Sequence, residues 1–248
     1  EYRYMFLNGA LIALVMTTVS VLCGTVLGLF GSMMRIIRFE NANVLLRALA
    51  WLMRMVSLLY VTLFRGTPLF VQIFIWYFVW LVALIHQDHG LLISGAEAVE
   101  IRRNYGALIA GTLALTVNAG AYITEIFRAG IQSIDKGQME AARSLGLTYW
   151  QAMRYIIVPQ ALRRMLPPLG NNMIALLKDT SLVSAIGLAE LAYAARTVAG
   201  AYGRYWEPYL AVALIYWLMT FVLTLGLRKL ETVSYTHLRA HETKANLV

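Results

Sequence analysis

The chain has 248 residues, of which 60% are hydrophobic and only 14% are charged. Soluble domains usually carry about 25% charged residues, and apolar stretches long enough to cross a bilayer recur here, which excludes an ordinary soluble protein. The formal net charge is +8, but the basic residues gather at the ends of apolar stretches, where they orient a membrane protein. We therefore expect a lipid bilayer and no nucleic acid as partner.

The first predicted span covers residues 6–30, long enough to cross a hydrocarbon core of about 30 Å. Gly24 and Gly28 are four residues apart, a spacing that lets a second helix approach closely. After a basic connection, residues 43–55 form an amphipathic segment that we expect to lie along the membrane surface before the chain re-enters the bilayer. The lone Cys23 excludes an intrachain disulfide.

The second predicted span covers residues 58–85 and is interrupted by the Arg-Gly-Thr-Pro sequence at residues 65–68. Glycine and proline bend or break a helix, and the freed backbone groups are tolerated in a membrane only where protein or water meets them. The interruption is either part of a transport site or a structural kink near the cytoplasmic surface, and the sequence leaves both open. His86 and His89 follow in a connection that we expect to be solvated, with no metal site, because no thiolate supports them.

The third predicted span covers residues 105–127 and is rich in small residues, which favour tight helix packing. Glu125 and Arg128 lie one helical turn apart at its end and can form an ion pair.

The fourth predicted span covers residues 166–186, with its entry marked by the Pro-Pro-Leu-Gly sequence at residues 167–170, and the fifth covers residues 208–227. An ionisable group inside a bilayer costs roughly 2.5–3.5 kcal/mol on insertion scales, so such groups usually pair or serve a pathway. Lys178 and Asp179 in the fourth span therefore either contact a solute or bond neighbouring spans near the outer interface.

A polar segment at residues 137–159, which we call the elbow, separates the third and fourth spans. Its first part suits a short helix from Gln138 to Leu145 that stops at Gly146. Thr148 and Gln151 then have the spacing of a capping box, which predicts a second helix. Small residues beside a turn-forming glycine let a partner's backbone approach closely, whereas the alternative is a loop that lies on the membrane surface.

The elbow resembles the EAA-loop signature of the permease subunits of ABC importers. It has Glu-Ala-Ala at residues 140–142, Gly146 after three intervening residues and Ile156 after nine more, and it departs from the usual pattern by Val158 in place of leucine. Residues 65–72, 121–131 and 178–182 are similar to the polar amino-acid uptake branch of that family. The resemblance covers roughly residues 5–232, which we expect to form one transmembrane permease domain.

This resemblance implies an all-α polytopic membrane protein with about five transmembrane helices and the permease fold of an ABC type I importer. It implies a transport subunit, not an enzyme, in the cytoplasmic (inner) membrane of a bacterium. The implied partners are two ATP-binding cassette subunits, a second permease copy or paralogue, and a periplasmic or extracellular solute-binding protein. The chain has no Walker A phosphate loop, so we expect no cofactor on it, and ATP with magnesium on the partner subunits.

The resemblance also implies functional residues. Those expected to couple to the ATPase are Gly137, Glu140, Ala141, Ala142, Gly146 and Pro159. Those expected along the substrate path are Thr67, Gln72, Glu125, Asn171, Asn172, Lys178 and Asp179.

The distribution of basic residues predicts the topology. Residues 31–58, 128–165 and 228 onward are enriched in Arg and Lys, whereas residues 86–104 and 187–207 are poorer in them and balanced by acids. Cytoplasmic connections carry the excess of basic residues. The N-terminus is therefore expected outside the cell, and the C-terminus and the elbow in the cytoplasm.

Two further expectations concern the ends of the chain and the rival functions. Residues 233–248 break from the membrane composition and resemble a translated sequencing adapter, and the chain begins at Glu1, so we expect a foreign tail and a missing native start. The alternatives are a permease of a related ABC importer for another small polar solute, or an ion-coupled secondary transporter, which would favour internal inverted repeats.

Overall fold

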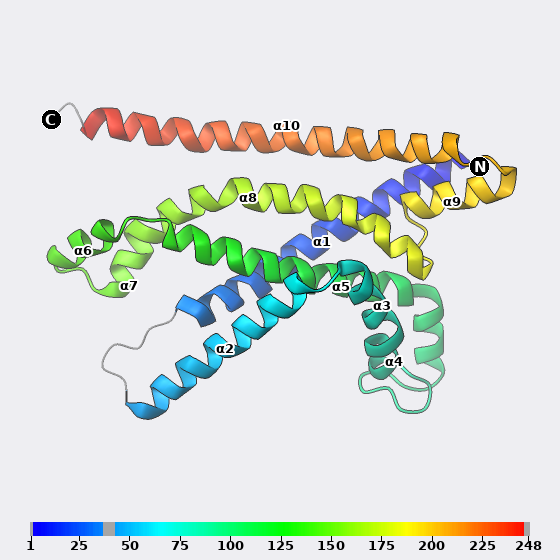
Figure 1. The fold of residues 1–248 in the computed structure, drawn as a ribbon, viewed down its shortest axis with the longest axis horizontal. Helices are drawn as coiled ribbons and strands as arrows, with labels where there is room; N and C mark the ends of the chain where they lie inside the picture. Colours follow the sequence, from blue (N-terminus) through cyan, green and yellow to red (C-terminus); the bar gives the residue numbers. More distant parts are fainter. Residues whose placement is uncertain (1, 37–42, 246–248) are drawn as a thin grey trace.

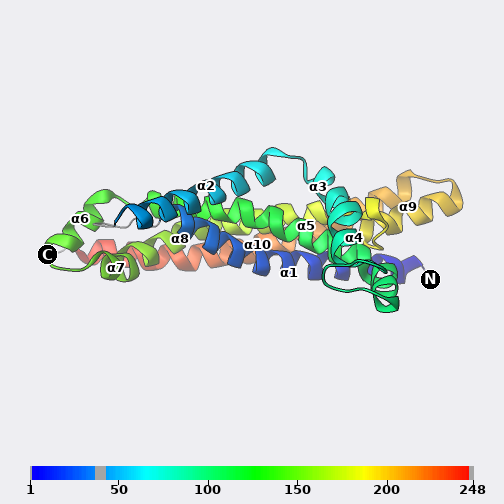
Figure 2. The same ribbon diagram turned by 90° about the horizontal axis from the view of Figure 1, so that it is seen from below.

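The long helices run from one end of the molecule toward the other, as the recurring apolar stretches predict (Figure 1). The computed structural model describes residues 2–36 and 43–245, with side chains described as far as Lys229. Seen from below, the bundle is elongated and flat (Figure 2). Its long helices are α1 (Tyr2–Ile36), α2 (Val44–Gly66), α5 (Ala96–Gln132), α8 (Val158–Asp179) and α10 (Trp206–Ala245).

Short elements gather at the two ends of this bundle. The elbow end carries α6 (Lys136–Ser144) and α7 (Tyr149–Ala152), and the opposite end carries α3 (Leu69–Ile75), α4 (Leu81–Leu84) and α9 (Leu191–Tyr202) (Figures 1 and 2). α1 starts at the end opposite the elbow and α10 runs back to the elbow end. The start of α1 and the end of α10 therefore lie toward opposite ends of the bundle (Figure 1). The predicted tail at residues 233–248 lies beyond the described side chains, and residues 246–248 lie outside the described backbone.

Four described helices are long and apolar enough to cross a membrane: α1, α2, α5 and α10. The chain is therefore an all-helical, multi-pass membrane protein. α8, which contains most of the predicted fourth span, is not among the four, because its arginines, prolines and asparagines lower its mean hydropathy. It packs against α5 on one side and α10 on the other.

α1 packs closely on α5 through small residues, as the Gly24 and Gly28 spacing predicts. A Cβ atom on Gly28 would lie 2.5 Å from the Ile123 side chain, and one on Gly24 would lie 3.1 Å from the Ala119 Cβ. The Ser20 hydroxyl donates a hydrogen bond across the same interface to the Thr112 carbonyl at 3.3 Å. Glycine therefore allows the two backbones to approach at positions where a side chain would keep them apart.

The predicted break in the second span is confirmed, but its predicted start is wrong. α2 ends at Gly66, and α3 begins at Leu69 after Thr67 and Pro68. Residues 43–55 do not form a separate surface segment, because Asn43 caps α2 and one uninterrupted helix continues to Gly66. No glycine or proline stands between these ends, so nothing in the sequence stops the helix there.

The prediction that residues 167–170 mark the entry of the fourth span is also wrong. Pro167 and Pro168 lie inside α8, and the helix continues from α7 through a π-helical turn at Met153–Ile157. The helix begins where Thr148 caps it. Prolines inside membrane helices are tolerated where neighbours satisfy the freed carbonyl groups. After Asp179 the chain tightens into a 3₁₀ helix at Thr180–Ile186.

The close approach of α1 to the start of α9 can be tested at Gly9. A Cβ atom there would lie 2.7 Å from the backbone nitrogen of Leu191, and backbone cannot move aside as a flexible side chain can. We expect Gly9→Ala to cost about 1–3 kcal/mol and to lower the thermal midpoint in detergent by roughly 3–9 °C. Gly200→Ala is the control, since no atom lies within 4 Å of the added Cβ. Equal midpoints for the two variants would contradict the close approach of α1 to the start of α9.

Candidate functional site

The elbow folds into a helix, a glycine stop and a second helix. Asp135 caps α6, its Oδ1 accepting from the Gly137 amide at 2.6 Å. At the other end Gly146 has φ +84°, its amide donates to the Arg143 carbonyl, and the Leu147 amide donates to the Ala142 carbonyl. This pair of bonds is a Schellman motif, which places a left-handed residue directly after a helix. The predicted short helix and its stop at Gly146 are confirmed.

The predicted capping box is confirmed as well. The Gln151 amide donates to the Thr148 hydroxyl at 3.3 Å, and the Thr148 amide donates to Gln151 Oε1 at 2.9 Å. The backbone N–H groups of Thr148 and Gln151, which lack an intrahelical partner, are therefore both hydrogen-bonded. The cap fixes the direction in which the chain leaves the elbow toward α8.

One face of α6 is small and exposed. Gly137, Glu140 and Ala141 are exposed, whereas Ala142 is buried, and Leu145 at the tip is 82% exposed. An apolar side chain is therefore exposed beside small residues at the tip of the elbow. Five of the six predicted coupling residues are exposed, Gly146 and Pro159 among them.

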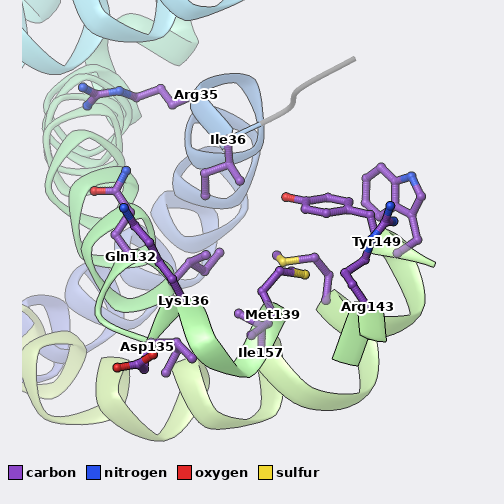
Figure 3. A pocket seen from close by; sticks show the side chains of 13 residues that line it. Arg35, Ile36, Gln132, Asp135, Lys136, Met139, Arg143, Tyr149 and Ile157 are labelled. Carbon is purple, nitrogen blue, oxygen red and sulfur yellow. The ribbon is translucent and has the colours of Figure 1, made fainter. Parts of the chain in front are cut away.

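A different face of α6 looks into a cavity of about 920 Å³ between the elbow and the end of α1 (Figure 3). Lys136, Met139 and Arg143, at the spacing of one helix face, line it together with Tyr149. The two faces of α6 thus differ in character. Lys136 and Arg143 give the cavity face long, basic side chains. Gly137 and Ala141 give the outward face small residues, which allow close contact.

Two side-chain hydrogen bonds join α8 to the elbow and to the end of α5. Arg164 on α8 donates to the Ser133 carbonyl at the end of α5. Gln160 at the start of α8 donates to Gln138 on α6 at 3.5 Å. α6 is thus bonded to the start of α8, and α8 is bonded to the end of α5.

At the helix break, side-chain amides satisfy the backbone that the break exposes. Gln72 Nε2 lies 2.8 Å from the Phe64 carbonyl and 2.8 Å from Thr67 Oγ1. Asn118 on α5 donates from Nδ2 to the Phe64 carbonyl at 3.0 Å and to Gln72 Oε1 at 3.1 Å. A carbonyl left unbonded inside a membrane costs several kcal/mol, and this cluster prevents that cost.

Of the two predicted path residues at the break, only Thr67 is accessible. Gln72 is only 4% exposed and its amide is already hydrogen-bonded, whereas Thr67 is exposed. Asn118 was missed by the sequence analysis. A single amide among the small apolar residues of a membrane helix is the signal that could have identified it.

Glu125 forms ion pairs with two arginines. Its Oε2 lies 2.9 Å from Arg35 of α1, and its Oε1 contacts Arg128, so the predicted Arg128 pair is confirmed. Glu125 lies two turns from the elbow end of α5, whereas Lys178 and Asp179 lie at the opposite end of α8. The structure therefore does not bring Glu125 together with them.

The remaining predicted path residues follow α8. Within residues 43–229, no hydrogen bond or ion pair joins the side chain of Lys178 or Asp179 to another residue. The Nδ2 of Asn172 is buried and lacks a hydrogen-bond partner. Residues at every third or fourth position form an exposed stripe along the helix: Arg164, Pro168, Asn171, Ala175 and Lys178. Buried polar atoms are nearly always bonded, so the Asn172 amide is an exception within α8.

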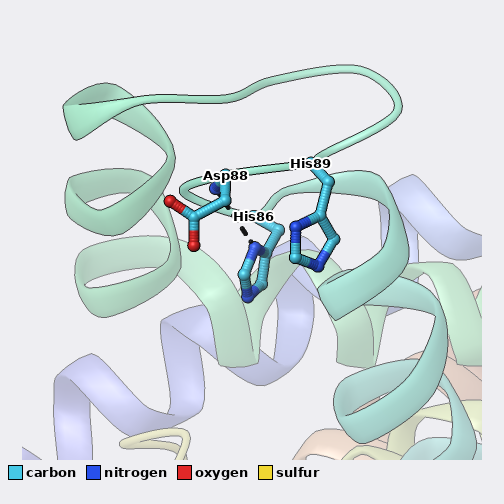
Figure 4. Close-up of side chains that lie close together, drawn as sticks. All are labelled: His86, Asp88 and His89. Atoms are coloured by element: carbon cyan, nitrogen blue, oxygen red, sulfur yellow. Dashed lines mark hydrogen bonds between the residues drawn. The ribbon is translucent and has the colours of Figure 1, made fainter.

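The two histidines of the connection between α4 and α5 lie close to one another (Figure 4). Their ring centroids are 4.1 Å apart, and the Asp88 amide donates to His86 Nδ1 at 3.2 Å. The atoms with which His86, Asp88 and His89 could bind a metal ion lie within 4.8 Å of one another. Structural zinc sites use four protein ligands, often with thiolates, and this surface cluster offers three without a thiolate.

The sequence matches the family described as binding-protein-dependent transport system inner membrane component over residues 44–232. It is 40% identical over 181 residues to the glutamine transport system permease protein GlnP of Escherichia coli (strain K12), covering 73% of this chain and 75% of that protein. It is 36% identical to the probable glutamine ABC transporter permease protein GlnM of Bacillus subtilis (strain 168), covering 92% of each. The crystal structure of an amino acid ABC transporter with histidines is similar to it with a TM-score of 0.73 and 36% identity, covering 93% of this chain and 94% of that one.

The amide cluster at the helix break can be tested by a double-mutant cycle. Asn118→Leu and Gln72→Leu should each destabilise the protein by about 1–3 kcal/mol, because each leaves buried polar groups unbonded. Since the two amides bond each other, the double variant should lose less than the sum of the two single losses. Thermal midpoints of the four proteins in one detergent measure this, and additive losses would contradict a shared network.

Proposed function

We propose that this chain carries polar amino acids across the cytoplasmic membrane of a bacterium. The chain belongs to the family of binding-protein-dependent transport system inner membrane components, and it is an importer permease and not an enzyme. Relatives described as glutamine and amino-acid permeases support the solute class. The similarity extends over nearly the whole of an amino acid ABC transporter chain.

The proposed assembly contains two ATP-binding cassette subunits, a second permease copy or paralogue, and an extracytoplasmic solute-binding protein. ATP and magnesium bind to the cassette subunits. The exposed stripe of α8 supports a second permease, because another protein surface or the solute between the two copies would provide partners for Asn171 and Lys178.

The elbow is the proposed docking point for the ATPase. When ATP closes the motor subunits, each docked elbow moves with them, and α5 and α8 follow because α6 directly follows α5 in the chain and is bonded to the start of α8. The solute path then opens outward to receive solute from the binding protein, and hydrolysis reverses the movement. Both states must lie within a few kcal/mol of each other for ligands to switch them.

The observation that carries this proposal is the continuous helix that leaves the elbow. It starts at the Thr148 capping box, passes through the π-helical turn and ends at Asp179. One continuous helix therefore joins the proposed ATPase contact to the proposed solute contacts. Pro159 lies in the first turn of α8, directly after the π-helical turn. Its missing N–H leaves the Tyr155 carbonyl without the usual α-helical donor, and a π turn accommodates such a gap.

For the solute contacts we propose Asp179 as the partner of the cationic group of an amino acid, with Asn171, Asn172, Thr67 and Lys178 nearby as polar contacts. An unpaired carboxylate in a membrane helix is costly unless a solute or water meets it. Gln72 and Glu125 act indirectly in this proposal, because their polar atoms are already bonded within the chain.

Substitution of Gly146 tests the coupling role. Gly146→Trp should reduce uptake at least about ten-fold, equivalent to roughly 1.4 kcal/mol, while the ATPase subunits still co-purify. The bulky residue is strained at φ +84° and obstructs the docking face. The measurement is solute uptake alongside ATP hydrolysis in proteoliposomes with the binding protein. Gly146→Asn is the matched control, since asparagine tolerates the left-handed conformation. Normal coupled uptake by the tryptophan variant would count against the mechanism.

Substitution of Asp179 tests the solute contact. Asp179→Asn should raise the KM for amino-acid uptake about ten-fold or more, the scale of a lost charge-assisted hydrogen bond, with assembly unchanged. Asp88→Asn, an exposed carboxylate in the loop before α5, should transport normally. Unchanged uptake of every candidate amino acid by Asp179→Asn would remove the assignment. Uptake of a different polar solute alone would point to a related importer.

A further inference from the structure

A completely buried carboxylate lies close to the end of α8. Glu190 is 0% exposed, the one Asp, Glu, Lys or Arg classed as buried in residues 2–36 and 43–229. It caps α9, its Oε1 accepting from the Tyr193 amide at 3.0 Å. Serine, threonine or asparagine caps a helix at a lower desolvation cost. The second carboxylate oxygen of Glu190 is therefore available for another role.

That second oxygen connects α9 to α10 and to the end of α8. Glu190 Oε2 lies 2.9 Å from the Tyr216 hydroxyl on α10. The same hydroxyl lies 3.3 Å from Thr180 Oγ1, which in turn donates to the Leu177 carbonyl at 2.7 Å. Thr180 is fully buried and directly follows Asp179. Three elements that are separate in the sequence thus meet in one chain of hydrogen bonds.

The number of available protons favours a neutral Glu190. If the carboxylate is ionised, Tyr216 donates to it and Thr180 donates to Leu177, so the contact between the two hydroxyls has no proton. If Glu190 is protonated, it donates to Tyr216, Tyr216 donates to Thr180, and Thr180 donates to Leu177. Burial, the largest influence, also raises the pKa of the Glu190 carboxyl, although hydrogen bonds to it act in the opposite direction. The protonated form satisfies every contact.

We propose that Glu190 and Tyr216 are positioning residues for solute binding, which hold Thr180 in place and thereby orient the neighbouring Asp179. This inference rests on the proposed role of Asp179 in solute contact. Asp179 ends α8, and Thr180 starts a 3₁₀ helix, whose backbone hydrogen bonds have poorer geometry than those of an α-helix. The backbone alone therefore fixes this junction weakly, and the buried side-chain chain supplies the missing restraint.

The first test removes one hydroxyl. Tyr216→Phe in the assembled, reconstituted transporter should raise the KM for uptake about three- to ten-fold, the scale of one lost hydrogen bond, while the maximal rate changes little. Tyr209→Phe is the matched control, because Tyr209 is exposed on the same helix two turns earlier. Its KM should equal that of the unmodified protein. A Tyr216→Phe variant that loses thermal stability but keeps its KM would overturn the proposal, since its role would then be structural only.

The second test uses the proton count. Glu190→Gln keeps an oxygen for the Tyr193 amide and offers an N–H donor to Tyr216, so its KM should remain close to that of the unmodified protein. Glu190→Leu removes both and should raise the KM as Tyr216→Phe does. A glutamine variant as impaired as the leucine variant would overturn the neutral-donor assignment.

Asp179→Asn in the same assay separates the two proposals. If it raises the KM and Tyr216→Phe does not, the positioning role is overturned and the solute contact stands. If neither variant changes the KM, the proposed solute contact fails, and the positioning role fails with it.

Discussion

The close approach of α1 to α5 is the interaction on which the rest of the structure depends. Lipid tails are as apolar as leucine, so helices in a membrane associate through van der Waals packing and interhelical hydrogen bonds. Here Gly24, Gly28 and Gly31 bring α1 against α5, and α5 becomes the most buried of the four long apolar helices. α2 and α8 pack on the same helix. α5 therefore supports both the helix break, through Asn118, and the elbow, through its C-terminal end.

Features that depend on local sequence were predictable. The stop at Gly146 follows from a glycine placed where a helix must end, and the box between Thr148 and Gln151 follows from spacing alone. The pairing of Glu125 with Arg128 needs only one helical turn, and the glycine face of α1 needs only a four-residue repeat. Each of these was correct because the partners lie within a few residues of one another or on one helix face.

Features that depend on the assembled fold were not predictable. Residues 167–170 mark the predicted entry of the fourth span, but the bundle around α8 accommodates Pro167 and Pro168 inside a helix that begins at Tyr149. Asn118 and Glu190 were missed because their partners, Phe64 and Tyr216, lie far away in the sequence. Hydropathy alone does not identify α8 as a membrane span, although a helix packed against protein on two sides can carry charges that an isolated span cannot.

The unbroken helix from Tyr149 to Asp179 is a lever arm roughly 45 Å long at the α-helical rise, so a swing of roughly 10° at the elbow would carry its far end about 8 Å. Such a displacement exceeds the width of an amino-acid side chain. The π-helical turn and the proline pair are the two points where this arm can bend. The stiffness of these two points would determine how much of a movement at the elbow reaches Asp179. Substitutions at these points would change the size of that movement without altering the residues at either end of the helix.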